Sequence, residues 1–159
     1  MNNIFEDLLW LPEAPQDFTQ RLNTSSNIND LQKLSKYALD ENQLNRLYKK
    51  FQSFQKEKAD LLPLTPMNVG IISNATTKLT TPALVATALR FGINLKVIEA
   101  EFDQIAQEAF SKESIFDDQN LNFILVAIDY HGLPFLTKPG DQNLAEKNII
   151  DCFSYIKSI

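Results

Sequence analysis

The sequence predicts an α/β fold: a partial three-layer parallel sheet preceded by a helical subdomain. Up to residue 62, apolar residues recur at helical spacing. From residue 63, short β-branched apolar runs alternate with helical segments, an order typical of parallel sheets. The runs are apolar throughout, as in strands buried on both faces. We therefore expect a helical subdomain at 1–62 and an α/β domain at 63–159.

The first two helices are expected before residue 40. The segment LPEAPQDFTQRL follows its prolines with Phe18 and Leu22 at helical spacing. Asn29 or Asp30 is a suitable N-cap for a second helix through INDLQKLSKYAL. Its apolar stripe comprises Leu31, Leu34 and Ala38. These stripes predict two short helices that share one core.

A third helix is expected after Asp40, which is a suitable N-cap. Its apolar stripe comprises Leu44, Leu47, Tyr48, Phe51 and Phe54. We interpret this stripe as core rather than as a ligand-binding face. The same helix has a basic patch at Lys49, Lys50, Lys56 and Lys58. A solvated helix face is the favoured interpretation of this patch, and a docking contact for an acidic partner is the alternative.

Three strands are expected after the Pro-punctuated break at 61–66, near 67–74, 93–99 and 122–129. Helices are expected at 79–92, 102–110 and 144–159. In the helix expected at 79–92, Thr80 or Thr81 is a suitable N-cap and Pro82 is suited to the first turn. Gly92 is a suitable residue for the end of that helix. The predicted buried strand residues are Ile71, Val97, Leu125 and Ala127. Truncating Leu125 to alanine is accordingly expected to cost about 2–5 kcal/mol.

Composition narrows the functional classes. The chain has 159 residues, of which 44% are hydrophobic, and a net charge of −5. This apolar content excludes an intrinsically disordered chain. An acidic chain does not attract nucleic acid in bulk, and no apolar run is long enough to predict a membrane-spanning helix. We therefore expect neither nucleic acid nor membrane as a partner.

The amino terminus and the cysteine usage predict a cytoplasmic protein. The segment MNNIFEDLLWLPEAP has acids where a signal peptide has basic residues. The single cysteine, Cys152, cannot form an internal disulfide. Its apolar neighbours in IIDCFSYIKSI favour a buried, inert thiol over a nucleophile.

Several motifs of common enzymes are absent from the sequence. It contains no GxGxxG, Walker loop or G-x-S-x-G elbow. It also contains no Cys/His cluster with zinc-ligand spacing. We therefore expect no cofactor or metal in this chain.

Candidate site residues follow the strands, because ligands of doubly wound sheets bind at the carboxyl ends of the strands. The candidates are Ser73, Asn74, Thr76, Thr77, Asp129 and His131. We expect them to line one polar cleft that binds an anionic or carbonyl group. The alternative is that they are ordinary turn and cap residues, with His131 an unremarkable surface histidine. The two-residue spacing of Asp129 and His131 does not by itself make a hydrogen-bonded pair.

Three stretches resemble a known family: WLPEAPQDF followed by Arg21, VGIISNATTKLTTPALVATALRFGINLKVIEAEFDQIAQEAF, and ILVAIDYHGLP. They are similar to the N-terminal region of FkbH-like proteins, in the HAD-type IIIC phosphatase group of biosynthetic enzymes. The resemblance spans most of the chain and is most specific across 69–109. It implies a three-layer SGNH/flavodoxin-like sheet, of which this chain is the front part. It also implies a following HAD domain, and Mg²⁺ is expected only for that absent domain.

The resemblance also implies how the SGNH motifs align. The G-D-S block, whose Ser is the nucleophile, matches Ser73, Asn74 and Ala75, so the hydroxyl is missing at position 75. The G-x-N block of the oxyanion hole matches Asp129, Tyr130 and His131. The D-x-x-H block that supplies the base is beyond this chain or absent. A Ser–His–Asp mechanism needs all three groups in contact.

Three functional hypotheses follow. The favoured one is a non-catalytic SGNH-like domain of an FkbH-like enzyme of a polyketide or surface-polysaccharide pathway. It would position a carrier-bound or phosphorylated substrate, with an acyl carrier protein and the HAD domain as partners. The second is an active SGNH-type ester hydrolase or acyltransferase that uses Ser73 or Thr76. The third is a helical scaffold that associates through the 40–58 surface.

Overall fold

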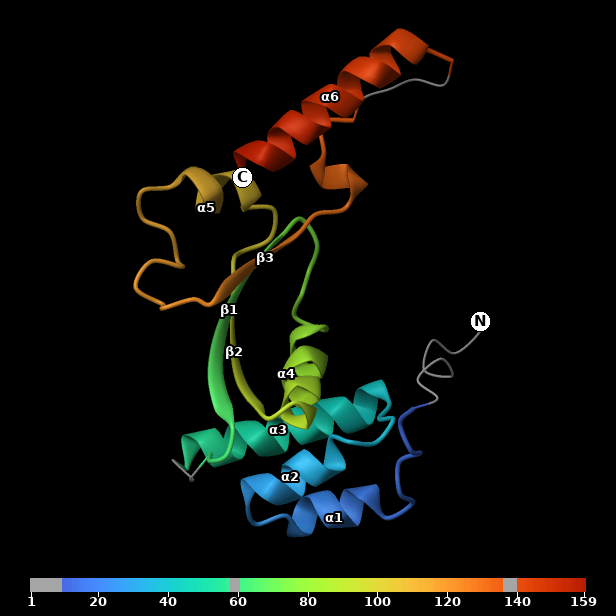
Figure 1. Cartoon of the computed structure of the whole chain (residues 1–159), viewed down its shortest axis with the longest axis vertical. Helices are drawn as coiled ribbons and strands as arrows, with labels where there is room; N and C mark the ends of the chain where they lie inside the picture. Colours follow the sequence, from blue (N-terminus) through green and yellow to red (C-terminus); the bar gives the residue numbers. More distant parts are fainter. Residues whose placement is uncertain (1–9, 58–60, 136–139) are drawn as a thin grey trace. The chain divides into compact units, whose positions relative to one another are not determined.

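The computed structural model describes residues 10–57, 61–135 and 140–159 (Figure 1). It divides into two compact units, which we call the helical unit and the sheet-end unit. The helical unit comprises Met1–Met67 and Lys78–Lys96. The sheet-end unit comprises Asn68–Thr77 and Val97–Ile159. These units do not follow a single boundary after residue 62, and the assignment of 1–62 and 63–159 as domains stays a prediction.

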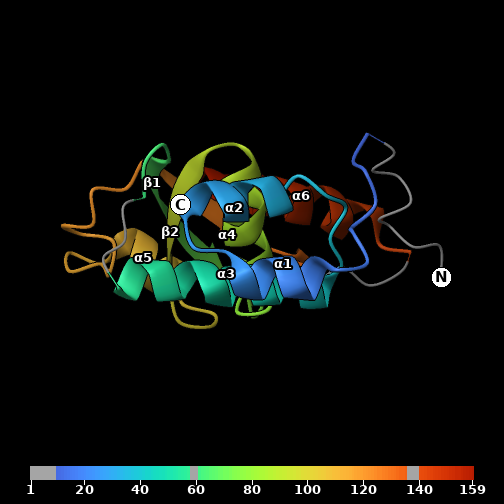
Figure 2. The same ribbon diagram turned by 90° about the horizontal axis from the view of Figure 1, so that it is seen from below.

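The helical unit packs four helices around one apolar core (Figures 1 and 2). They are α1 (Phe18–Thr24), α2 (Ile28–Leu34), α3 (Glu41–Lys56) and α4 (Thr81–Arg90). The predicted stripe of the third helix supplies the centre of this core: Leu47 and Phe51 are fully buried, and Leu44 and Phe54 are nearly so. The fourth helix is followed by Gly92, whose φ of 72° favours glycine at that position.

Two caps define where the helices of this unit begin. The side chain of Asp40 accepts a hydrogen bond from Gln43 N, and the side chain of Gln43 accepts one from Asp40 N, as expected for a capping box. The second cap corrects the sequence interpretation: Asn27, not Asn29 or Asp30, caps α2 by accepting from Asp30 N. Because α2 begins earlier than expected, Asp30 lies in its first turn.

Arg90, at the end of α4, connects this helix to the segment after α2. Its Nε donates to the carbonyl oxygen of Ser35 at 2.7 Å, and its Nη2 donates to that of Tyr37 at 3.2 Å. The guanidinium also lies 5.6 Å from the ring centroid of Trp10. Burial lowers the pKa of Arg90 from its ordinary value. The side chain of Arg90 therefore provides hydrogen-bond donors for two backbone carbonyls that lie outside the helices.

The sheet is parallel and its strands have the order β2-β1-β3. The strands are β1 (Thr65–Ser73), β2 (Ile93–Glu99) and β3 (Phe123–Ala127). Thr65 N donates to Gly92 O at one end of the β1–β2 pair and Ala100 N donates to Ile71 O at the other, so both strands run the same way. Helices flank the sheet, and the predicted α/β fold class is confirmed.

The sheet-end unit also contains α5 (Ile105–Phe110), the 3₁₀ turn η2 (Tyr130–Gly132) and α6 (Gln142–Ser158). Gly70 is in the middle of β1, where a Cβ would come within 2.8 Å of the side chains of Phe116 and Leu121. The absence of a side chain at this position therefore lets the segment before β3 pack directly on the strand.

The buried residues of the sheet differ from the prediction. Ile71 is buried as expected, but Val97 and Ala127 are only partly covered, and Leu125 is 48% exposed. The prediction for Leu125 is wrong because β3 is an edge strand and neither of its faces is covered: Ile124 and Val126, which point the other way, are exposed as well. Four apolar side chains of α6, the helix that follows, are also exposed and do not provide the missing cover: Ile149, Ile150, Phe153 and Ile156.

Two further findings concern these elements. Cys152 is buried on α6, in agreement with its apolar surroundings in the sequence. No described helix combines the length and the apolar character that crossing a lipid bilayer requires.

Candidate functional site

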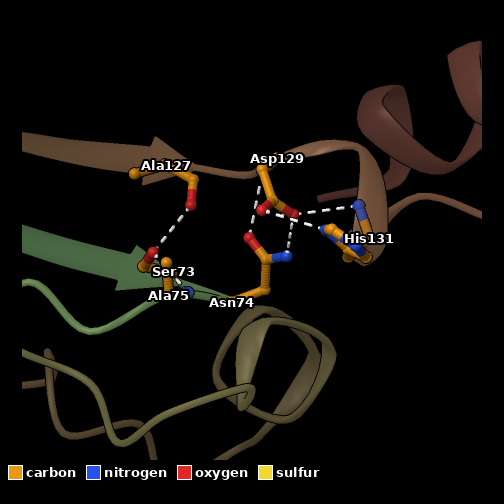
Figure 3. Close-up of polar contacts among 6 residues, drawn as sticks. All are labelled: Ser73, Asn74, Ala75, Ala127, Asp129 and His131. Carbon is orange, nitrogen blue, oxygen red and sulfur yellow. Dashed lines mark hydrogen bonds and ion pairs between the residues drawn. The ribbon is translucent and has the colours of Figure 1, made fainter.

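The candidate site lies where β1 and β3 end next to each other, within the sheet-end unit. The register pairs Ser73 with Ala127, so the residues that follow the two strands leave the sheet side by side. Asn74 is the first residue after β1, and Asp129 is the second after β3. Figure 3 shows their side chains pointing toward each other. Parallel pairing thus brings together residues that are 55 positions apart in the sequence.

Asn74 and Asp129 form a reciprocal pair. The backbone N–H of Asp129 donates to Asn74 Oδ1 at 3.0 Å, and Asn74 Nδ2 donates to Asp129 Oδ1. A carboxamide has both a donor and an acceptor, so it can satisfy both groups at once. The pair joins the two loops that follow the strands, and it involves the amide of Asn74, a residue that the sequence predicts to line the binding cleft.

His131 lies on the other side of the Asp129 carboxylate (Figure 3). Asp129 is the N-cap of η2 and accepts from His131 N at 2.9 Å. The turn brings His131 Nδ1 to 3.3 Å from Asp129 Oδ2. The imidazole also stacks on Tyr130, with the ring centroids 3.8 Å apart. A carboxylate that contacts one ring nitrogen is the arrangement that orients a general base.

The cluster of Asn74, Asp129 and His131 is open to solvent. The side chains of His131 and Asp129 are 67% and 50% exposed, so the cluster forms a polar surface and not an enclosed pocket. The hydrogen bond from Asn74 is the main reason that the pKa of Asp129 is below its ordinary value of 3.8, and the contacts with His131 add to this effect. The cluster therefore has a fixed negative charge at neutral pH.

Ser73 is not part of this cluster. Its hydroxyl donates to Ala127 O at 2.8 Å and accepts from Ala75 N at 3.0 Å, and the residue is buried. The hydroxyl thus connects β1 to β3 and closes the turn after β1. A group that is used in this way is a structural element of the sheet and is not available as a nucleophile.

The two threonines of the turn point to different surroundings. Thr77 Oγ1 donates to Glu99 Oε1 at 2.9 Å, at the end of β2. Thr76 is exposed. The structure therefore brings together Asn74, Asp129 and His131 among the six candidates, and it places Ser73, Thr76 and Thr77 outside this cluster.

Sequence reasoning missed the role of Gly132. A Cβ at this position would lie 2.8 Å from the side chain of Asn74 and 2.9 Å from Ile128. Glycine is thus needed for the close approach of η2 to Asn74. The HG dipeptide after a strand was the available signal, because glycine often marks a close approach of the backbone to another group.

Removing the amide of Asn74 is expected to change the titration of Asp129. The pKa of Asp129 is lowered in the folded chain. The hydrogen bonds of the ionised carboxylate are therefore fully present at pH values above the ordinary pKa, and they are lost as the pH falls through the lowered pKa. In Asn74→Ala the pKa should rise toward 3.8. A ¹³C NMR titration of the carboxyl carbon measures this change, with Thr76→Ala as the control. An unchanged Asp129 pKa in Asn74→Ala would contradict the pairing.

In the described ranges, no three His, Cys, Asp or Glu side chains gather as possible ligands of a metal ion.

Comparison with known proteins identifies a structural neighbour. No protein-family model and no curated protein matches the chain. The chain is similar to a crystal structure of the N-terminal part of the protein BF1531 from Bacteroides fragilis, which contains a phosphatase domain and is complexed with Mg. The TM-score is 0.53 at 14% sequence identity. What the two chains share is the fold.

The similarity to BF1531 covers 84% of this chain and 30% of the other, so the present chain spans about a third of its neighbour's length. That neighbour is the N-terminal part of a protein with a phosphatase domain.

Proposed function

We propose that this chain is a non-catalytic, SGNH-like N-terminal region of an FkbH-like, HAD-family biosynthetic protein. In this proposal the exposed cluster of Asn74, Asp129 and His131 holds part of a substrate for chemistry that takes place on a phosphatase-type domain. The similarity in fold to the N-terminal part of BF1531 supports such a domain arrangement.

The use of the Ser73 hydroxyl within the sheet is the observation that favours a non-catalytic role. Residue 75, where the resemblance implies the nucleophile, is alanine. The nearest serine, Ser73, is buried and bonds to Ala127 and Ala75. The Asp129–His131 pair therefore has no serine hydroxyl beside it to deprotonate. Both side chains are also exposed, so water would reach a group that reacts there.

The charge of the cluster favours one of the two substrate classes. Asp129 is ionised at neutral pH, and a phosphate or carboxylate next to it would be repelled. A neutral carbonyl can accept a hydrogen bond from His131 without this penalty when the ring is an imidazolium, because Nδ1–H then faces Asp129 and Nε2–H points to the ligand. We therefore propose a carrier-bound substrate, presented as a thioester by an acyl carrier protein, as the ligand of this cluster.

An NMR titration tests the binding role. Acetyl-pantetheine, a neutral thioester, is expected to shift the amide signals of Asn74 and residues 129–132 in the ¹⁵N-labelled chain. His131→Ala should abolish these shifts, whereas Thr76→Ala should preserve them. Shifts that survive in His131→Ala would place the ligand elsewhere and contradict the proposed site.

The alternative is an SGNH-type ester hydrolase or acyltransferase, and the Asp129–His131 contact of 3.3 Å is the observation in its favour. We expect hydrolysis of 4-nitrophenyl acetate no faster than with an equal concentration of imidazole. Rapid turnover that disappears in Thr76→Ala or Ser73→Ala, with both variants folded, would establish the hydrolase instead.

A further inference from the structure

A basic groove lies between α1 and α3 of the helical unit. It has a volume of about 580 Å³ and is lined by Thr19 and Asn23 from α1 and by Arg46, Lys49 and Lys50 from α3, among others. Three of the lining residues are cationic and none is acidic. This concentration of positive charge occurs in a chain with a net charge of −5, and the function proposed above does not use it.

Neutral groups hold two of the three cations in place. Arg46 Nη1 donates to Thr19 Oγ1 at 2.9 Å, and Lys50 Nζ donates to the carbonyl oxygen of Asn23 at 3.5 Å. Lys50 Nζ also lies 5.4 Å from the ring centroid of Phe54. These contacts orient the side chains without neutralising them, so the cations are positioned before an anion arrives.

Within the part of the chain that the structure describes, Arg46, Lys49 and Lys50 form no ion pair with a carboxylate, unlike Arg21, which pairs with Asp17. Like charges gathered on neighbouring turns of a helix repel one another, so the arrangement costs stability in the absence of an anion. The hydroxyl of Thr19 accepts from Arg46 and still has its own hydrogen to donate. The groove therefore offers several donors around one region of positive charge.

We infer that this groove binds a dianionic phosphate group. A guanidinium matches the geometry of phosphate oxygens with two parallel hydrogen bonds, and lysines add charge without a fixed direction. A carboxylate has one negative charge and two oxygens, which fits three cations less well. The volume suits a small phosphorylated molecule, since ligand pockets commonly measure about 300–1,000 Å³.

Titration of the full ¹⁵N-labelled chain with glycerol 3-phosphate tests the inference. The amide signals of 19–23 and 46–50 should shift, and glycerol at equal concentration should leave them unchanged. A second titration uses inorganic phosphate. If inorganic phosphate binds more weakly than glycerol 3-phosphate, the groove is a site for phosphate esters. If the two bind equally, the groove is a site for the free anion. Failure of both anions to bind at millimolar concentration would refute the inference.

Charge variants distinguish the groove from general attraction. Arg46→Gln and Lys49→Gln should each raise the dissociation constant by about tenfold or more, as expected when a hydrogen bond to a charged group is lost. Lys56→Gln is the matched control, because Lys56 is on the same helix but does not line the groove. Equal weakening in all three variants, or tighter binding of a single-stranded oligonucleotide than of glycerol 3-phosphate, would overturn the inference.

Discussion

Phe51→Ala is expected to destabilise the helical unit by about 3–5 kcal/mol. Phe51 lies at the centre of α3 and has none of its surface exposed. Truncation removes an aromatic ring from a closely packed core and leaves a cavity that the surrounding helices fill only in part. This is the largest effect that we expect from a single substitution in the described part of the chain.

Hydrogen exchange of individual amides is the suitable measurement, because a chain with two compact units need not unfold in one step. The most protected amides of α3 should exchange about 10²–10⁴-fold faster in Phe51→Ala. Leu125→Ala is the control: this side chain is 48% exposed, so its loss should leave α3 protection unchanged. If Leu125→Ala lowered the protection of the α3 amides as much as Phe51→Ala does, the exposed position of Leu125 on β3 would be contradicted.

Arg90→Met is expected to cost about 2–3 kcal/mol, since hydrogen bonds to charged groups are stronger than average. The substitution keeps a long apolar side chain but leaves the carbonyls of Ser35 and Tyr37 without their donor. Arg90→Lys should be intermediate, because one ammonium group cannot reproduce the two-pronged geometry of the guanidinium.

The denaturant midpoint, followed by circular dichroism, measures the effect of Arg90, and Lys36→Met provides the matched control. Lys36 lies in the same segment after α2, is exposed, and also loses one positive charge in this variant. Its midpoint should stay close to that of the unsubstituted chain. An Arg90→Met midpoint as high as that of Lys36→Met would show that the two carbonyls find other partners.

The sequence predicted the elements well because the patterns are local. The apolar spacing of α3 and the cap at Asp40 require only that neighbouring residues agree on one structure. The cap of α2 was misassigned because Asn27, Asn29 and Asp30 are all good capping residues, and the sequence does not distinguish them. The choice depends on which start lets Ile28 and Leu31 enter the core.

The exposure of Leu125 could not be predicted from the sequence. A continuous apolar run indicates a strand that is suited to burial on both faces. Whether layers actually cover it depends on the strand order and on where later helices pack, which are properties of the fold. The edge position of β3 left this residue partly in solvent.

The cluster was predicted in position but not in detail. Adjacent parallel strands bring Asn74 and Asp129 to the same edge, as topology requires. The two-residue spacing of Asp129 and His131 does not indicate their contact, which depends on the 3₁₀ turn at residues 130–132 that folds His131 back. The bonds of Ser73 depend on the register of β3 and have no sequence signature.

The uncovered apolar residues of β3 and α6 affect how the protein should behave in a common folding assay. Phe123, Ile124, Ile150 and Phe153 are each at least half exposed. Fluorescent dyes that bind apolar surface, such as ANS, normally signal a loosely packed acid state. For this chain such a dye should bind the native protein at neutral pH, while the near-ultraviolet circular dichroism still indicates fixed aromatic side chains.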